Sequence, residues 1–435
     1  MAGPLTMLRS NAAGSTIAAQ QPIAPNLTPA DVAALLDRLT PLSAKFRQSS
    51  SPQDIPLNQR TLTLGQQDSA QLTNVGLGTG MISEHVVTLS LQNTSAASLT
   101  VNIDPWFPWS LLNTTMLQLN GGAVPYSASG KGGLMVRARN RDSFLLVGPS
   151  GVGVPASLCR LTISSGTFTA TAAGDFSLSG QASLTIAAST TATIVATFYT
   201  FEKLVYDENT LMGAIPAQNN SMYVAINRTP IGALAAAHQA AAPFYPTTSL
   251  TATLTSWNVN ATYQFWSVPS DPALYAPMVE NSYQVQEQRQ LTVNATGTQA
   301  LQYTLPQNEY LMAAHLLISD NNGNWLVWND LTQLYVVYNG GNLLPVRQHT
   351  GRQRARDWAF RKWDTGLIPG YTLWDGTETA ETPADADEAG WVNAYAAATP
   401  QILADIASGA STPLTYGLVR ESLVAGSVKV AAQGS

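Results

Sequence analysis

The sequence predicts an all-β protein built from two β-sandwiches in tandem, and three observations support this. The chain has 435 residues, which is too long for one ordinary core. From about residue 55 its segments are rich in Val, Thr, Ile and Phe, and several alternate polar and apolar residues between Gly, Ser and Asn turns. That pattern is typical of antiparallel strands. Finally, one short pattern, in which apolar residues precede Asn-Gly-Gly and a Pro follows, occurs twice: LQLNGGAVPYS at 117–127 and VVYNGGNLLPV at 336–346.

The repeated pattern indicates two equivalent domains. A shift of 219 residues superposes two tryptophans and an Asn-Gly-Gly turn: Trp106, Trp109, Asn120, Gly121 and Gly122 fall on Trp325, Trp328, Asn339, Gly340 and Gly341. Because only 10 residues are Trp, this coincidence favours a duplication. Asn-Gly supplies the positive φ angles of a tight turn, so two unrelated hairpins with similar turns are the alternative. We expect Gly121 and Gly340 to occupy matching places.

An amphipathic helix is predicted ahead of the β-rich body, in NLTPADVAALLDRLTPLSAKF. Thr28 suits the N-cap and Pro29 the first helical position, and Pro41 should end or kink the helix. Its apolar face and its nearby cations comprise Val32, Leu35, Leu36, Leu39, Arg38, Lys45 and Arg47. This segment suits an anionic lipid surface, or it packs under the first sandwich.

A stretch with little strand character separates the two β-rich regions. In residues 229–248, TPIGALAAAHQAAAPFYPTT, an Ala run suggests a short helix, and Pro243 and Pro246 punctuate it. We therefore predict an N-terminal arm with its helix at 1–54, a first sandwich at 55–245, and a second sandwich with a C-terminal arm at 246–435.

The composition excludes several classes of protein. Only 11% of the residues are charged, against a typical quarter, which suits a surface largely covered by neighbours. A net charge of −6 argues against general or sequence-specific nucleic-acid binding. The single Cys159 excludes intrachain disulfides. We find no run of 18 apolar residues and no good signal peptide, so synthesis in a cytoplasm is expected.

The sequence contains no set of residues typical of catalysis, and we predict neither an enzyme nor a cofactor. SASGKGG around Lys131 lacks the residues of a phosphate loop, and no His has metal-ligand spacing. The acidic stretch at 374–391 could bind a cation, although a solvated loop is favoured: Glu378, Glu381, Asp385, Asp387 and Glu388. The basic stretch RQHTGRQRARDWAFRKW at 347–363 suggests an amphipathic helix. It could contact phosphates or an acidic neighbour, although a solvated face whose arginines pair with nearby acids is favoured over nucleic-acid contact.

Four stretches of the sequence resemble the major capsid proteins of tectiviruses. ATFYTFEKLVYDENTLMGAIPAQNNSMYVAIN, 196–227, resembles the end of their first jelly roll, with Met212 departing from the pattern; the matching positions are Glu208, Asn209, Thr210, Leu211, Gly213, Ala214, Ile215 and Pro216. LTPADVAALLDRL resembles their opening helix, RQRARDWAFRKWDTGLIPGYTLWD their basic helix, and TYGLVRESLVAGSV their final strand and arm. The order of these stretches carries the resemblance.

The resemblance implies two tandem eight-stranded jelly rolls with an N-terminal helix and short flanking helices. It also implies pseudo-hexagonal homotrimers that tile an icosahedral shell over an internal lipid membrane of a tailless bacterial virus. Expected partners are other copies of the chain, membrane lipids through the N-terminal helix, and minor capsid, vertex or membrane proteins. The alternative is a secreted or surface β-sandwich that binds carbohydrate, since aromatic side chains such as Trp106 and Trp325 can stack on sugars.

Overall fold

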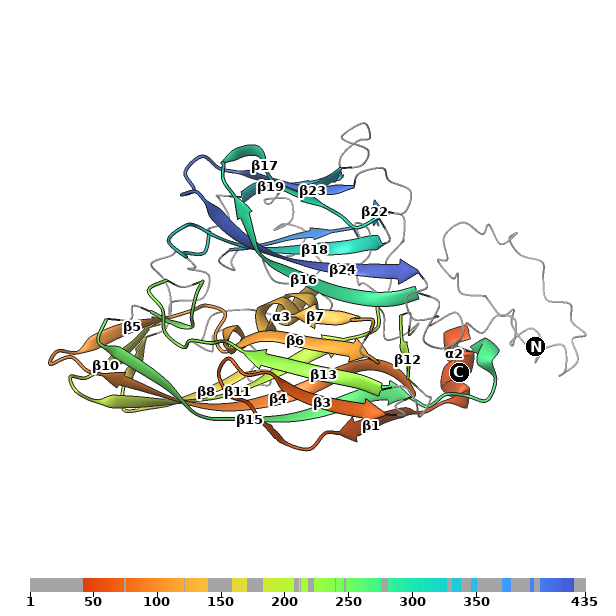
Figure 1. Ribbon diagram of the computed structural model, residues 1–435, viewed down its shortest axis with the longest axis horizontal. Coiled ribbons are helices and arrows are strands. Elements are labelled where there is room, and N and C mark those ends of the chain that lie inside the picture. Colours follow the sequence, from red (N-terminus) through yellow and green to blue (C-terminus); the bar gives the residue numbers. More distant parts are fainter. Residues whose placement is uncertain are drawn as a thin grey trace, which may run out of the picture.

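Two β-sandwiches lie one above the other, with a helix between them (Figure 1). The computed structural model describes residues 42–73, 76–120, 122–139, 159–169, 183–206, 211, 213–217, 223–238, 240–245, 248–274, 281–307, 309–326, 331–337, 346–349, 370–376, 392–394 and 400–425. Four main sheets, which we number 1 to 4, form the two sandwiches.

The first half, by which we mean the chain up to Trp266, the end of β15, supplies sheets 1 and 2, and the rest of the chain is the second half. Sheet 1 has the order β1 (Pro52–Pro56), β15 (Leu250–Trp266), β4 (Gly76–Asn93), β11 (Thr191–Lys203) and β8 (Cys159–Ser164), with β2 (Arg60–Thr61) and β12 (Ile215–Ala217) beside it. Sheet 2 has the order β3 (Asp68–Thr73), β13 (Tyr223–Pro230), β6 (Leu112–Leu119) and β7 (Tyr126–Ala128). A side sheet joins β14 (Phe244–Tyr245), β5 (Leu99–Ile103), β10 (Ser183–Ile186) and β9 (Thr167–Thr169).

The second half supplies sheets 3 and 4. Sheet 3 has the order β16 (Asn281–Val293), β24 (Leu414–Ala425), β18 (Tyr310–Ser319) and β21 (Tyr371–Asp375), with β22 (Val392–Asn393) beside β18. Sheet 4 has the order β17 (Gly297–Thr304), β23 (Gln401–Ile406), β19 (Leu331–Val337) and β20 (Val346–His349). A short parallel pairing of β16 with β7 joins sheets 2 and 3 edge to edge.

The same eight-strand order occurs in both halves. In chain order, the main strands of the first half lie in sheets 1, 2, 1, 2, 2, 1, 2 and 1: β1, β3, β4, β6, β7, β11, β13 and β15. Those of the second half lie in sheets 3, 4, 3, 4, 4, 3, 4 and 3: β16, β17, β18, β19, β20, β21, β23 and β24. Within each sheet the neighbouring strands are also the same, and their pairings are antiparallel. This order is that of a jelly roll, so the predicted fold class, a double jelly roll, is confirmed.

Alternation along the strands builds the cores. In β4 the side chains of Val87, Leu89 and Leu91 are fully buried, while the residues between them are half-buried or exposed. A side chain on every second position faces the partner sheet, because successive residues of a strand point to opposite faces. The second sandwich buries Leu316, Ile318 and their neighbours between sheets 3 and 4 in the same way.

Strand β15 belongs to the first half, although the sequence places the domain boundary before it. It pairs with β4 from Leu250 to Trp266. The Pro- and Ala-rich stretch that suggested the boundary is instead the connection between the seventh and eighth strands. Its described residues between 231 and 245 form turns, a bridge and β14, not the predicted short helix. The domain limits remain a prediction, and this pairing favours a boundary after Trp266.

The described helices are few. α2 (Leu42–Ser49) begins just after Pro41, where the sequence predicts the end of a helix, and Phe46 anchors it to the first half by packing against Trp266, with ring centroids 5.8 Å apart. α3 (Gly130–Arg139) lies between the sandwiches, and two short 3-10 helices are η1 (Trp109–Leu111) and η2 (Pro272–Leu274). In the part of the chain that is described, no helix is long and apolar enough to span a membrane.

Candidate functional site: the seam between the two jelly rolls

The contact region between the two halves, which we call the seam, holds the densest set of buried ion pairs. Helix α3 of the first half lies in it, against the face of sheet 3 that points away from the second core (Figure 1). Three groups of contacts fix α3 and its surroundings: one at each end of the helix, and one at the loop between β5 and η1.

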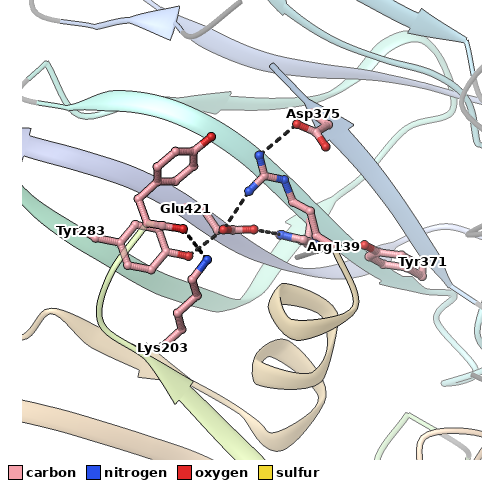
Figure 2. A network of polar contacts seen from close by, with 8 residues as sticks. Arg139, Lys203, Tyr283, Tyr371, Asp375 and Glu421 are labelled. Carbon is pink, nitrogen blue, oxygen red and sulfur yellow. Dashed lines mark hydrogen bonds and ion pairs between the residues drawn. The ribbon is translucent and has the colours of Figure 1, made fainter. Parts of the chain in front are cut away.

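Arg139, at the C-terminal end of α3, is the centre of the first group (Figure 2). Its Nη1 donates to Glu421 Oε2 at 2.9 Å, and its Nη2 donates to Asp375 Oδ1 at 3.0 Å. All three side chains are 0% exposed. A cation at this position also interacts favourably with the helix dipole. One residue of the first half thus bridges two strands of the second.

Glu421 accepts further hydrogen bonds from its own half. Tyr283 OH donates to Glu421 Oε2 at 2.6 Å, and His315 Nε2 lies 2.8 Å from Glu421 Oε1. The other ring nitrogen of His315 lies 2.9 Å from Tyr371 OH. A neutral imidazole that donates from Nε2 can accept from Tyr371 at Nδ1, so this arrangement uses both nitrogens.

The electrostatics of this group favour charged partners. Burial alone would raise the pKa of Glu421, but Arg139 and the hydrogen bond from His315 hold it at about 2. Burial opposes the charge of Arg139, yet Asp375 and Glu421 outweigh this and raise its pKa well above the usual value. The pKa of Tyr283 is raised by burial and by Glu421. The phenol therefore stays a donor to a carboxylate that is ionised at neutral pH.

The N-terminal end of α3 is held by Glu287 of β16. The backbone N–H of Ser129 donates to Glu287 Oε2, and Ser129 Oγ lies 3.2 Å from Glu287 Oε1. Ser129 Oγ also accepts from the N–H of Gly132 at 3.0 Å, as an N-cap does. A carboxylate from the second half thus satisfies the positive end of a helix of the first half.

The SASGKGG stretch serves this close approach. A Cβ on Gly130 would overlap the backbone oxygen of Trp109, and a Cβ on Gly132 would lie 2.8 Å from Glu287 Oε2. Glycine is required because α3 lies so near η1 and β16.

The two duplicated tryptophans provide the third group. Trp325 Nε1 of the second half donates to Asp104 Oδ1 of the first at 3.0 Å, and Lys131 Nζ lies 4.6 Å from the centre of the Trp325 ring. Trp106 of the first half packs edge to face with Tyr371 of the second, with ring centroids 6.2 Å apart. Burial raises the pKa of Asp104, while Lys131 opposes the shift. Both tryptophans are therefore seam residues.

The positions of the predicted duplicated residues can be compared in part. Trp106 and Trp325 both lie between the third and fourth strands of their halves, and Trp109, in η1, donates from Nε1 to Tyr199 O at 2.8 Å. Asn120 has φ +46° and Gly122 donates to Leu119 O at 2.7 Å, so a turn follows the fourth strand. The other five positions lie outside the described residues: Gly121, Trp328, Asn339, Gly340 and Gly341. The equivalence of the two sets therefore stays a prediction.

Most of the predicted membrane-facing residues also lie outside the described residues: Val32, Leu35, Leu36, Leu39 and Arg38. Lys45 and Arg47 lie in α2, where the Arg47 guanidinium is 5.6 Å from the centre of the Trp266 ring. The acidic stretch at 374–391 is described only to residue 376, where Asp375 binds Arg139; the five carboxylates singled out above and the basic stretch after His349 are not described. Among the described residues, no three His, Cys, Asp or Glu side chains are placed to hold a metal.

Sequence reasoning missed the central seam residues, although one signal was present. In TYGLVRESLVAG, two adjacent charges interrupt an apolar strand. Arg420 faces one side and donates to Glu309 Oε1 at 2.5 Å, while Glu421 faces the other side and α3. A charge within an otherwise apolar strand indicates a buried position at which the charge needs a partner.

The strand order and the seam define a class of protein: a double jelly roll whose halves are fixed by buried charges. No protein-family model and no curated protein matches the sequence. Solved structures do match. The crystal structure of the STIV major capsid protein gives a TM-score of 0.55 at 13% identity, covering 88% of this chain and 99% of that one. The atomic structure of Sulfolobus Turreted Icosahedral Virus gives 0.54 at 12% identity, covering 88% and 93%. At such identities the likeness shows the shared fold.

Proposed function

We propose that this chain is a major capsid protein that forms pseudo-hexagonal homotrimers and tiles the icosahedral shell of a virus. The repeat of one eight-strand order in two halves carries this proposal. Three such chains place six similar sandwiches around one axis, and six similar sides make a near-hexagonal tile. The fold shared with the STIV major capsid protein supports the same role.

The seam supports this proposal because a tile must keep its two sandwiches in one orientation. Buried ion pairs hold the C-terminal end of α3, and a carboxylate that accepts from the Ser129 N–H holds its N-terminal end. Replacing one partner of an ion pair would leave an unpaired buried charge. Such a contact disfavours other arrangements of the two halves. In this role the protein acts by shape and assembly, not by catalysis.

We further propose a shell over an internal lipid membrane, in a tailless bacterial virus of the tectivirus-like lineage. The apolar face of residues 32–39 and the nearby cations support this part of the proposal. α2, which follows that segment, is fixed to one end of the first half by the buried Phe46. The chain would be made in the host cytoplasm and would meet minor capsid, vertex or membrane proteins in the virion.

A carbohydrate-binding role is not favoured by the tryptophans that suggested it. Trp106 is 2% exposed and Trp325 is 5% exposed. A ring that stacks on a sugar must present a face to solvent.

Light scattering of the purified full-length chain tests the assembly. We expect a trimer of about 139 kDa, three times the chain mass of 46.2 kDa, and hexagonal tiles by electron microscopy. A monodisperse monomer at high concentration would contradict the proposal.

Co-sedimentation with vesicles tests the membrane part separately. We expect the full-length chain to bind vesicles that contain anionic phospholipid, and Leu35→Asp with Leu39→Asp to abolish this while trimers persist. Equal binding by both proteins would exclude this segment as the membrane contact.

A further inference from the structure

Sheets 1 and 3 are counterparts, yet within the described residues only sheet 3 has its outer face covered. By outer face we mean the face that points away from the core of its own sandwich. On sheet 3 this face carries His315, Asp375 and Glu421, which are all 0% exposed because α3 and the first half cover them. Leu373 and Val419 between them are 1% exposed.

The centre of the outer face of sheet 1 is half-open and carries a single charge, while the exposed Asp54 on β1 and Arg160 on β8 lie beside it. Its central positions on β4, β11 and β15 are half-buried or exposed: Glu84, Val86, Thr88, Ser90, Thr193, Val195, Thr197, Tyr199, Asn258, Asn260, Thr262 and Gln264. Glu84 is the only charged residue among them, and it accepts hydrogen bonds from Tyr199 OH at 2.9 Å and from Asn260 Nδ2 at 3.2 Å. A solvated sheet face normally carries Lys and Glu, whereas the core of an interface is depleted of them.

We propose that the outer face of sheet 1 binds a second copy of this chain, and that the second half of that copy covers it from the side of sheet 4. This inference rests on the proposed function. Within one chain, the half that contains sheet 2 covers the outer face of sheet 3. Sheet 4 is the counterpart of sheet 2, and sheet 1 is the counterpart of sheet 3. Repeating the seam between chains therefore brings sheet 4 of one copy toward sheet 1 of the next.

Repetition of this contact between chains would close them into a ring. A contact between two different surfaces is heterologous, and it forms a ring when the rotation closes. With three chains, the seam would occur three times within chains and three times between them. All six sandwiches would then have one similar neighbour on each side.

The described part of the outer face of sheet 4 is buried within this chain: its side chains Tyr335, Val337 and Leu403 are 0%, 7% and 4% exposed. The next copy would therefore cover sheet 1 with its second half as a whole, and not with these side chains. The carboxylate of the sheet 4 face, Asp405, accepts from Tyr335 OH at 3.0 Å and from the backbone N–H of Gln299 at 2.8 Å. Glu84 and Asp405 are thus each bound by neighbours of their own sheet, so neither is a bare carboxylate where another copy approaches.

The test places one negative charge at the centre of the sheet 1 face. Val86→Glu and Val195→Glu are made separately in the full-length chain, and Gln71→Glu is the matched control. Gln71 is an exposed strand position of β3 in sheet 2, so it adds the same charge to the other sheet of the same sandwich. Light scattering gives the oligomeric state, and circular dichroism with thermal melting checks that each chain is folded.

We expect trimers from the wild type and from Gln71→Glu, and at least a tenfold rise in the dissociation constant of the trimer for folded Val86→Glu and Val195→Glu. Trimers of unchanged affinity from all four proteins would overturn the assignment of this face and leave the proposed function standing. Dissociation of Gln71→Glu to the same extent would also overturn it, because the effect would not belong to this face. A monomeric wild type would instead contradict the proposed function itself.

Discussion

Among the described residues, two of the buried clusters that contain both acidic and basic groups differ in how their charges are matched. In the seam, Arg139 donates to Glu421 and Asp375 at 2.9 and 3.0 Å. Inside the first sandwich, Arg228 donates only to uncharged groups, Ser83 Oγ at 2.9 Å and Met81 Sδ at 3.3 Å. Glu202 in this second cluster accepts from Thr200 Oγ1 at 2.8 Å, and its Oε2 has no hydrogen-bond partner among the described residues.

The pKa shifts of the two clusters therefore run in opposite directions. In the seam the pKa of Glu421 falls to about 2 and that of Arg139 rises. In the core, burial raises the pKa of Glu202 and lowers that of Arg228, and their mutual attraction only reduces these shifts. The seam favours ionised partners, whereas the core cluster disfavours its own charges. Charge stabilises the contact between the halves, and apolar packing stabilises the interior of each.

Removing one seam charge should have the largest effect. Glu421→Gln leaves Arg139 buried with one carboxylate, so we expect the free energy of unfolding at pH 7 to fall by about 3–5 kcal/mol. Glu202→Gln, the matched change in the core cluster, should leave stability unchanged or raise it, because it removes a carboxylate that burial disfavours. Urea unfolding of both variants measures this. Equal losses from the two variants would show that the clusters do not differ.

The two carboxylates should also respond oppositely to acid. The pKa of Glu421 is about 2 in the folded chain against 4.5 for an ordinary Glu, so its contribution is present above pH 4.5 and is lost as the pH falls toward 2. The gap between wild type and Glu421→Gln should therefore narrow below pH 4.5, by up to about 3 kcal/mol. Glu202 has a raised pKa, so wild type should gain stability relative to Glu202→Gln on acidification.

Urea titrations at pH 7, 5 and 3 check both signs. A gap for Glu421→Gln that stays constant across this range would mean that its carboxylate is not held ionised by the seam.

The fold could be predicted from the sequence more fully than the seam. Strand positions were predictable because alternation in stretches such as EHVVTLSLQ follows directly from burial of one face. The fold class followed from these strands, the duplication and the resemblance. Strand pairing was harder: LTATLTSW and ATYQFWSV read as two strands, but β15 continues through both, because residues 258–260 between them also pair with β4.

The seam residues could not be predicted as partners, because tertiary structure alone brings them together. Arg139 and Glu421 are 282 positions apart, and no local pattern relates them. Asp375 lies at the start of an acidic stretch that suggested a cation site, yet its partner is a guanidinium. The tryptophans were found by their spacing, and only the packing shows that they contact the opposite half.

A smaller loss should follow from crowding the N-terminal end of α3. Gly130→Ala places a Cβ against the backbone oxygen of Trp109, which cannot move without shifting η1, so we expect a loss of about 1–3 kcal/mol. Gly232→Ala is the control, because a Cβ there meets no atom within 4 Å. Its stability should stay the same or rise by up to about 1 kcal/mol. Thermal unfolding of both variants measures the difference, and equal melting temperatures would show that α3 is not tightly fitted to the seam.

A difference of similar size should separate Trp106 from Trp325, the two tryptophans that the sequence pairs. Trp325→Phe removes the donor to Asp104 and leaves that buried carboxylate with fewer partners, so we expect a loss of about 1–3 kcal/mol beyond the loss of ring volume. Trp106→Phe removes a similar volume, but its Nε1 has no hydrogen-bond partner among the described residues. The difference between the two variants therefore isolates the hydrogen bond across the seam. Equal losses would mean that both tryptophans act by packing alone, and that duplication preserved their shape and not a polar contact between the halves.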